Sequence, residues 1–116
     1  MLPHKTSGTL KLLAVSSARR SAAAPDLPTI AETTGIKDFD FTLWVGFFAP
    51  RGTPAEIVTR LNTEINRILE QPDVRAKLLE NGADVTPMSI DQFTAFVRSE
   101  SEKYVRIIKE TGITPE

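Results

Sequence analysis

Ser16, Ser17 and Arg20 follow a short apolar run, and their hydroxyl and guanidinium groups could bind a carboxylate. In open α/β sheets, ligands collect at the carboxyl ends of strands, so side chains that follow a buried strand are candidates for such a site. Thr42 and Trp44 end a second strand-like run and could form a supporting wall. Each of Ser16, Ser17 and Arg20, taken alone, is also explained as a solvated loop residue. Trp44 is also explained as part of a core or its edge.

Few other residues offer catalytic or metal chemistry. The chain has no cysteine and a single histidine, His4. We therefore expect neither a zinc site nor a Ser-His-Asp triad. Asp38 and Asp40 would share a face of an extended segment, but a cation needs more oxygen ligands, so a solvated face is the better interpretation. Glu100 and Glu102 fall at polar helix positions and are expected to be exposed. We expect no catalytic residue, metal or cofactor.

Length and charge exclude further classes of protein. The 116 residues suit a single unit, residues 1–116, or a piece of a larger one. Fourteen basic residues nearly cancel fifteen acidic ones without blocks of like charge, which argues against binding to nucleic acid or to an anionic membrane. No apolar run approaches the roughly 20 residues of a membrane span. The first residues, MLPHKTSG, lack the apolar region of a secretory signal peptide.

Three segments have strand-like patterns. Residues 10–15 (LKLLAV) form an almost continuous apolar run, which predicts a buried strand. Residues 39–44 alternate between Phe or Leu and polar or larger side chains, which is typical of a half-buried strand, and the apolar run continues over residues 45–49. Residues 83–86 could form a brief extended segment.

Two capping boxes predict where helices begin, because the side chains of the N-cap and of the third helical residue satisfy each other's backbone N–H groups. Thr29 with Glu32 predicts a short helix, and Ser89 with Gln92 predicts a long one. A glycine ends each pattern (Gly35 and Gly112).

A third helix is predicted after a Pro-Gly turn, with Thr53 as N-cap, Pro54 at the first helical position and Glu56 completing a capping box. Its apolar residues form one helical stripe: Ile57, Val58, Leu61, Ile65, Ile68 and Leu69. Pro72 should start a further short helix that ends at Gly82. Two or three strands with this much apolar helix surface would leave sheet edges unpaired, so the pattern indicates part of a larger α/β body.

Four stretches in this order carry a family resemblance: LKLLAVSSARRS, PDLPTIAE, WVGFFAPRGTPAEIVTRLNTEIN and PDVRAKLLENGADV. Together they resemble the carboxy-terminal portion of the periplasmic solute-binding receptors of tripartite tricarboxylate transporters, the Bug or TctC-type proteins. The resemblance implies an α/β fold class, part of a type II periplasmic-binding-protein fold, which is helix-rich with short strands and three C-terminal helices. It also implies binding of small carboxylates between two lobes, delivery to membrane transporter subunits, a periplasmic location and no enzymatic chemistry.

In the family, many ligand contacts come from glycine- and serine-rich loops of the amino-terminal part, which has no counterpart in this sequence. We therefore expect weakened or lost binding by the isolated chain, and homodimerisation through apolar surface that absent segments would otherwise cover. An alternative function is an interaction or dimerisation module that acts through its helical surface without binding a solute.

Overall fold

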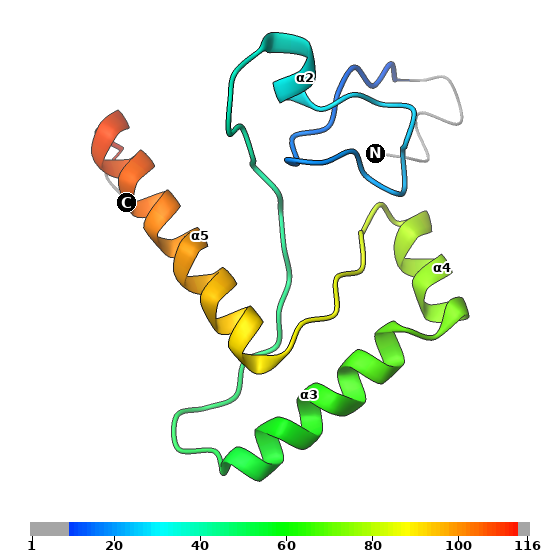
Figure 1. Cartoon of the computed structure of the whole chain (residues 1–116), viewed down its shortest axis with the longest axis vertical. Coiled ribbons are helices and arrows are strands. Elements are labelled where there is room, and N and C mark those ends of the chain that lie inside the picture. Colours follow the sequence, from blue (N-terminus) through cyan, green and yellow to red (C-terminus); the bar gives the residue numbers. More distant parts are fainter. Residues whose placement is uncertain (1–9, 114–116) are drawn as a thin grey trace.

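The computed structural model describes residues 10–113, and this part of the chain contains four helices. Their bounds are α2 Ile30–Thr34, α3 Ala55–Leu69, α4 Pro72–Glu80 and α5 Ile90–Thr111 (Figure 1). A long extended segment over residues 35–54 joins α2 to α3, and a shorter one joins α4 to α5 (Figure 1). None of the helices described is long and apolar enough to cross a bilayer.

The ends of α2 and α5 confirm the predicted capping boxes. Thr29 Oγ1 accepts a hydrogen bond from the Glu32 backbone N–H at 3.1 Å, and Glu32 Oε2 accepts one from the Thr29 N–H at 3.0 Å. Ser89 and Gln92 make the same reciprocal pair at the start of α5. Each helix ends at a glycine in the left-handed region, with φ of 72° for the first and 68° for the second. These boundaries follow from contacts within four residues.

The start of α3 differs from the prediction. Pro54 is the N-cap, and no side chain caps the helix, so the predicted box between Thr53 and Glu56 is wrong. The Thr53 hydroxyl instead donates to the Pro50 carbonyl oxygen at 2.8 Å, which closes the preceding turn. α4 begins at Pro72 as predicted, and Gly82 follows its C-cap with φ of 81°.

The predicted strands are not formed within residues 10–113. The only β pairing described there is an isolated parallel bridge between Val15 and Thr29, with hydrogen bonds from Val15 N to Pro28 O and from Ile30 N to Val15 O, both 2.9 Å. The prediction that residues 10–15 are buried is also wrong, since Leu13 is 71% exposed. A strand needs a ladder partner along its length, and only Val15 of this run is paired.

Residues 39–44 and 83–86 likewise form no strand. The first segment makes one backbone hydrogen bond to another segment, from Phe41 N to Ser16 O at 2.8 Å. Its apolar alternation is real, but no second or third hydrogen bond follows to make a ladder. It remains a single extended segment that lies along α5.

Buried apolar side chains are rare in the part of the chain described, where Ala24 and Leu27 are the two examples. The apolar stripe of α3 is only half covered, because Ile57, Leu61 and Ile68 remain exposed. The radius of gyration is 17.1 Å, whereas a compact domain of this length has about 13 Å. The helices and loops therefore form an open arrangement without a central core.

Candidate functional site

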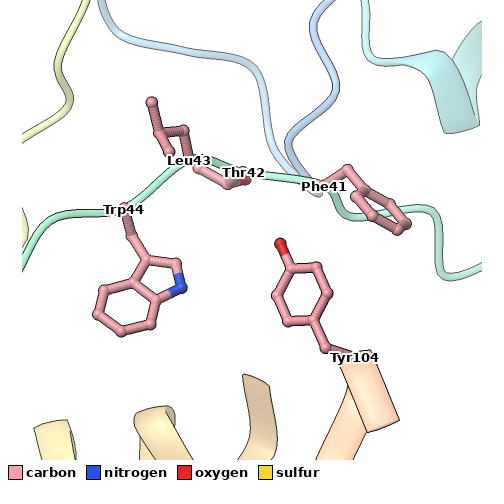
Figure 2. Close-up of a pocket in the computed structure, with 5 residues that line it drawn as sticks. All are labelled: Phe41, Thr42, Leu43, Trp44 and Tyr104. Atoms are coloured by element: carbon pink, nitrogen blue, oxygen red, sulfur yellow. The ribbon is translucent and has the colours of Figure 1, made fainter. Parts of the chain in front are cut away.

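An open hollow of about 230 Å³ lies between the extended segment and α5. Its lining consists of Phe41, Thr42, Leu43, Trp44 and Tyr104 (Figure 2). Figure 2 shows the Tyr104 ring rising from α5 toward the Phe41–Thr42 backbone, with the indole nitrogen of Trp44 on the side that faces Tyr104. Neither the Trp44 indole N–H nor the Tyr104 hydroxyl is engaged by another residue of the part described. Both donors are therefore available to a ligand.

Aromatic contacts hold this segment against α5. The Trp44 ring meets the rings of Phe93 and Phe96 edge-on, with centroid distances of 6.1 and 5.3 Å. The Phe48 ring lies 5.4 Å from the Phe93 ring, centroid to centroid, with the two planes tilted by 50°. Between them, Gly46 brings its backbone so close that a Cβ there would lie 2.3 Å from Phe93 Cζ. The absence of a side chain at this position lets the wall of the hollow approach the helix.

A nearly buried ion pair on α5 also fixes the segment. Lys103 Nζ lies 2.6 Å from Glu100 Oε1 and donates to the Asp40 carbonyl oxygen at 3.1 Å. The ammonium group stands over the rings of Phe41 and Tyr104, at 5.8 and 5.5 Å from their centroids. The predicted exposure of Glu100 is wrong, because this residue is only 9% exposed. The carboxylate is buried because the Lys103 side chain, one turn later, folds over it toward the segment.

Asp40 connects two segments and is not merely solvated. Its Oδ1 atom accepts hydrogen bonds from the Thr42 hydroxyl at 2.8 Å and from the Ala18 backbone N–H at 3.2 Å. Asp38 has a positive φ of 60°, a conformation that Asp tolerates better than most residues. Within residues 10–113, no group of three or more His, Cys, Asp or Glu side chains could hold a metal ion. His4 lies outside the described residues.

The predicted site residues fall into two groups. Thr42 and Trp44 line the hollow, and Ser16 supports it, because its hydroxyl donates to the Phe41 carbonyl oxygen at 2.7 Å. Ser17 is used locally, since its hydroxyl donates to the Arg19 carbonyl oxygen. Arg20 lies away from the hollow and donates from Nε to Glu32 Oε2 at 3.0 Å.

The capping role of Glu32 explains its electrostatics. The hydrogen bond from the Thr29 backbone N–H lowers the pKa of the Glu32 carboxyl, burial opposes this shift, and the Arg20 guanidinium lowers the pKa further. Arg20 therefore forms a half-exposed ion pair with a helix cap. The positive charge of Arg20 is thus paired with the Glu32 carboxylate in the first turn of α2.

Sequence reasoning missed Tyr104, Lys103 and Glu100. Tyr104 falls in the apolar pattern of the long helix, and that pattern predicts packing against the core. The one signal available was the spacing of Glu100 and Lys103, which allows an ion pair across one helical turn. The contact of Lys103 with Asp40 joins residues 63 positions apart in the sequence and has no local sequence signal.

The family described as "Tripartite tricarboxylate transporter family receptor", TctC, matches residues 1–113 of the chain. The chain belongs to this family. A curated relative from Pseudomonas sp. (strain P51), "UPF0065 protein in tcbD-tcbE intergenic region", is 37% identical over 101 residues, covering 87% of this chain and 30% of the relative. Protein BugT of Bordetella pertussis is 34% identical over 112 residues, covering 97% of this chain and 34% of BugT. This TctC-family chain thus spans about a third of the length of the relatives it matches.

Solved structures also match nearly all of this chain over little more than a third of their own length. The structure described as "R. palustris Rpa4515 with adipate" matches 98% of the TctC-family chain at a TM-score of 0.80 and 36% identity, over 38% of its own length. The periplasmic binding protein BugD matches with the same TM-score and coverage at 30% identity. MatC (Rpa3494) from Rhodopseudomonas palustris with bound malate matches 92% of this chain at a TM-score of 0.72 and 33% identity, over 37% of MatC. The expected helix-rich part of a periplasmic-binding fold is confirmed.

Proposed function

We propose that this chain supplies one wall of the solute site of a receptor for tripartite tricarboxylate-type uptake, and that the solute is a small carboxylate. The observation that carries the proposal is the match of 98% of the chain, at a TM-score of 0.80, to a structure that contains adipate. The family match over residues 1–113 supports the receptor role. The membrane subunits of the transporter would then be the partners of the assembled receptor, in the periplasm.

The chemistry of the hollow suits an acid with a short hydrocarbon body. The Trp44 indole N–H and the Tyr104 hydroxyl provide two donors for carboxylate oxygens, and the faces of the aromatic rings can cover methylene groups. The Lys103 ammonium lies behind the hollow, but Glu100 offsets most of its charge. Donors and aromatic surface, more than net charge, would select the ligand.

The first test uses Trp44 as a reporter, because it is the only tryptophan and its indole N–H gives one NMR resonance. The purified chain would be titrated with adipate, malate and the uncharged diamide of adipic acid. We expect a saturable shift of the indole resonance with the acids and none with the diamide. Binding should be weak, since one open wall buries little of a ligand.

Matched variants separate the hollow from the rest of the surface. Tyr104→Phe removes one donor and should weaken acid binding several-fold, whereas Ser17→Ala removes a hydroxyl that serves only its own loop and should leave binding unchanged. An indole resonance that stays fixed up to the solubility limit of the acids would contradict the proposal. Equal shifts with the diamide would assign the effect to apolar contact alone.

A second candidate function is an interaction module without solute binding. The exposure of apolar residues such as Leu43 and Val45 favours it. Sedimentation analysis of the purified chain distinguishes the two functions: a self-associating chain without any response of Trp44 to acids supports the module. A monomer that responds to acids supports the receptor wall.

A further inference from the structure

The Thr42 side chain differs from the other polar groups of the hollow in its hydrogen bonding. Its hydroxyl donates to Asp40 Oδ1 at 2.8 Å, so its one hydrogen is already used. No donor among the described residues reaches the Thr42 oxygen, which keeps its lone pairs for a ligand. Trp44 and Tyr104, on the same lining, offer an N–H and an O–H donor. The hollow therefore combines two donors with an oxygen that can only accept.

Asp40 holds the Thr42 hydroxyl in this orientation. The same Asp40 Oδ1 atom accepts a second hydrogen bond from the Ala18 backbone N–H at 3.2 Å, and the Lys103 ammonium donates to the Asp40 carbonyl oxygen at 3.1 Å. Asp40 is thus fixed both from a separate segment and from α5. A hydrogen bond to a carboxylate is stronger than one between neutral groups, so the Thr42 hydrogen stays on Asp40 when a ligand arrives.

This arrangement distinguishes ligand groups that accept hydrogen bonds from groups that donate them. A carboxylate has only acceptor oxygens, so it suits the Trp44 N–H and the Tyr104 hydroxyl but is repelled by the Thr42 oxygen, which has no hydrogen to give. A hydroxyl on the carbon next to the carboxylate can donate to that oxygen. Figure 2 shows the Tyr104 hydroxyl pointing toward the part of the segment that carries Thr42, so a donor and the acceptor face the same part of the hollow.

We propose that Thr42 is a specificity residue that selects acids with a hydroxyl next to the carboxylate, and that Asp40 is the residue that positions the Thr42 hydroxyl. The proposal rests on the proposed function, since it concerns the same hollow and the same class of ligand. An ammonium group next to the carboxylate would also donate, but it would lose hydration without gaining a carboxylate partner, because the lining of the hollow contains none. The ligand class is thus a 2-hydroxy acid and not an amino acid.

The test compares acids that differ in one group. The purified 116-residue chain is titrated with succinate, malate and aspartate, and the indole resonance of Trp44 reports each dissociation constant. We expect malate to bind about two- to tenfold more tightly than succinate, which is the range for one additional hydrogen bond. Aspartate should bind no more tightly than succinate.

Variants of Thr42 separate its acceptor oxygen from the shape of its side chain. Thr42→Val replaces the hydroxyl by a methyl group of similar size and should bring the ratio of malate to succinate affinities close to one. Thr42→Ser keeps the hydroxyl and should keep the ratio. Thr63→Val is the matched control, because the Thr63 hydroxyl donates to the Thr59 carbonyl oxygen within α3 and Thr63 does not line the hollow.

The positioning role of Asp40 is tested by the same ratio. Asp40→Ala frees the Thr42 hydroxyl to donate to a carboxylate, so the ratio should fall toward one. Asp40→Asn retains an oxygen that accepts from Thr42 and should restore the ratio. A loss of folded protein weakens the binding of both acids equally and leaves the ratio unchanged, so the ratio separates positioning from stability.

Several results would overturn the proposal. Equal affinities of the unaltered chain for malate and succinate, or a preference for malate that survives in Thr42→Val, would show that Thr42 selects nothing, while acid binding at the hollow would stand. Aspartate that binds more tightly than malate would assign the selected group to an ammonium. An unchanged ratio in Asp40→Ala would remove the positioning role of Asp40. An indole resonance that responds to neither malate nor succinate would contradict the proposed function and, with it, this selectivity.

Discussion

Gly46 is the position at which one added methyl group tests how closely the extended segment lies against α5. A Cβ at this residue would lie 2.3 Å from Phe93 Cζ and 3.0 Å from Phe93 Cε2, so Gly46→Ala must displace the Phe93 ring. That ring is held by Trp44, Phe48 and Phe96, with centroid distances of 5.4 to 6.4 Å. The substitution therefore strains a cluster and not one free side chain.

The magnitude follows from two opposing effects. Overpacking a contact of this kind costs about 1–3 kcal/mol. Gly46 does not have a positive φ, so alanine fits the backbone and stabilises the protein by about 0.4–1 kcal/mol through the unfolded state. We expect a net loss of about 1–2 kcal/mol, and each kcal/mol lowers the midpoint of thermal unfolding of a small domain by roughly 4–8 °C.

The Phe93→Leu background isolates the clash, because leucine lacks the ring atoms that approach Gly46. In that background Gly46→Ala should cost nothing or become slightly stabilising, giving a coupling energy of about 2 kcal/mol between the two sites. Urea unfolding followed by far-ultraviolet circular dichroism measures all four proteins. Gly52→Ala is the control, since nothing lies within 4 Å of that position and its positive φ of 88° should cost the same in both backgrounds. An equal cost of Gly46→Ala in both backgrounds would refute the close approach.

Three further predictions concern charges and caps. Folding lowers the pKa of Glu32 below its ordinary value of 4.5, so its stabilising effect is present above that value and is lost as the pH falls through the folded value. Glu32→Gln should therefore flatten the loss of thermal stability as the pH falls below about 4.5, and an unchanged acid profile would contradict the assignment. Ser89→Ala should cost about 1 kcal/mol of helix stability, and Thr53→Ala should cost less because its hydroxyl caps no helix; equal losses in circular dichroism would count against this. Lys103→Met should destabilise the chain by about 1–3 kcal/mol, because it leaves the nearly buried Glu100 carboxylate without its ion-pair partner. Adding Glu100→Gln should recover part of that loss in urea unfolding, and a fully additive second loss would show that the pair does not act as a unit.

The helices could be predicted because their signals are local. Thr29, Ser89 and the glycines that follow each helix act through hydrogen bonds within one turn, and the structure keeps those boundaries. The predicted cap at Thr53 was wrong for an equally local reason. The proline that follows occupies the N-cap position, and the Thr53 hydroxyl closes the turn before it.

The strands could not be predicted from their apolar patterns because a strand is defined by its partner. Of residues 10–15 only Val15 is paired, in a bridge with Thr29, and residues 39–44 make one backbone hydrogen bond to another segment, at Phe41. The candidate site was partly predicted for the same reason. Thr42 and Trp44 line the hollow, but Tyr104 lines it from a helix about sixty residues later, where Lys103 also bonds to the Asp40 carbonyl oxygen.

Leu43 belongs both to the exposed apolar residues of the extended segment and to the lining of the hollow. An apolar run with no polar alternate is typical of a strand covered on both faces, and here α5 covers only one of them. Leu43 lines the hollow while its side chain is almost fully exposed, so the hollow is open to solvent at that wall and the chain should bind an acid weakly. Closing a site removes water and orders its donors before the ligand arrives, which raises affinity.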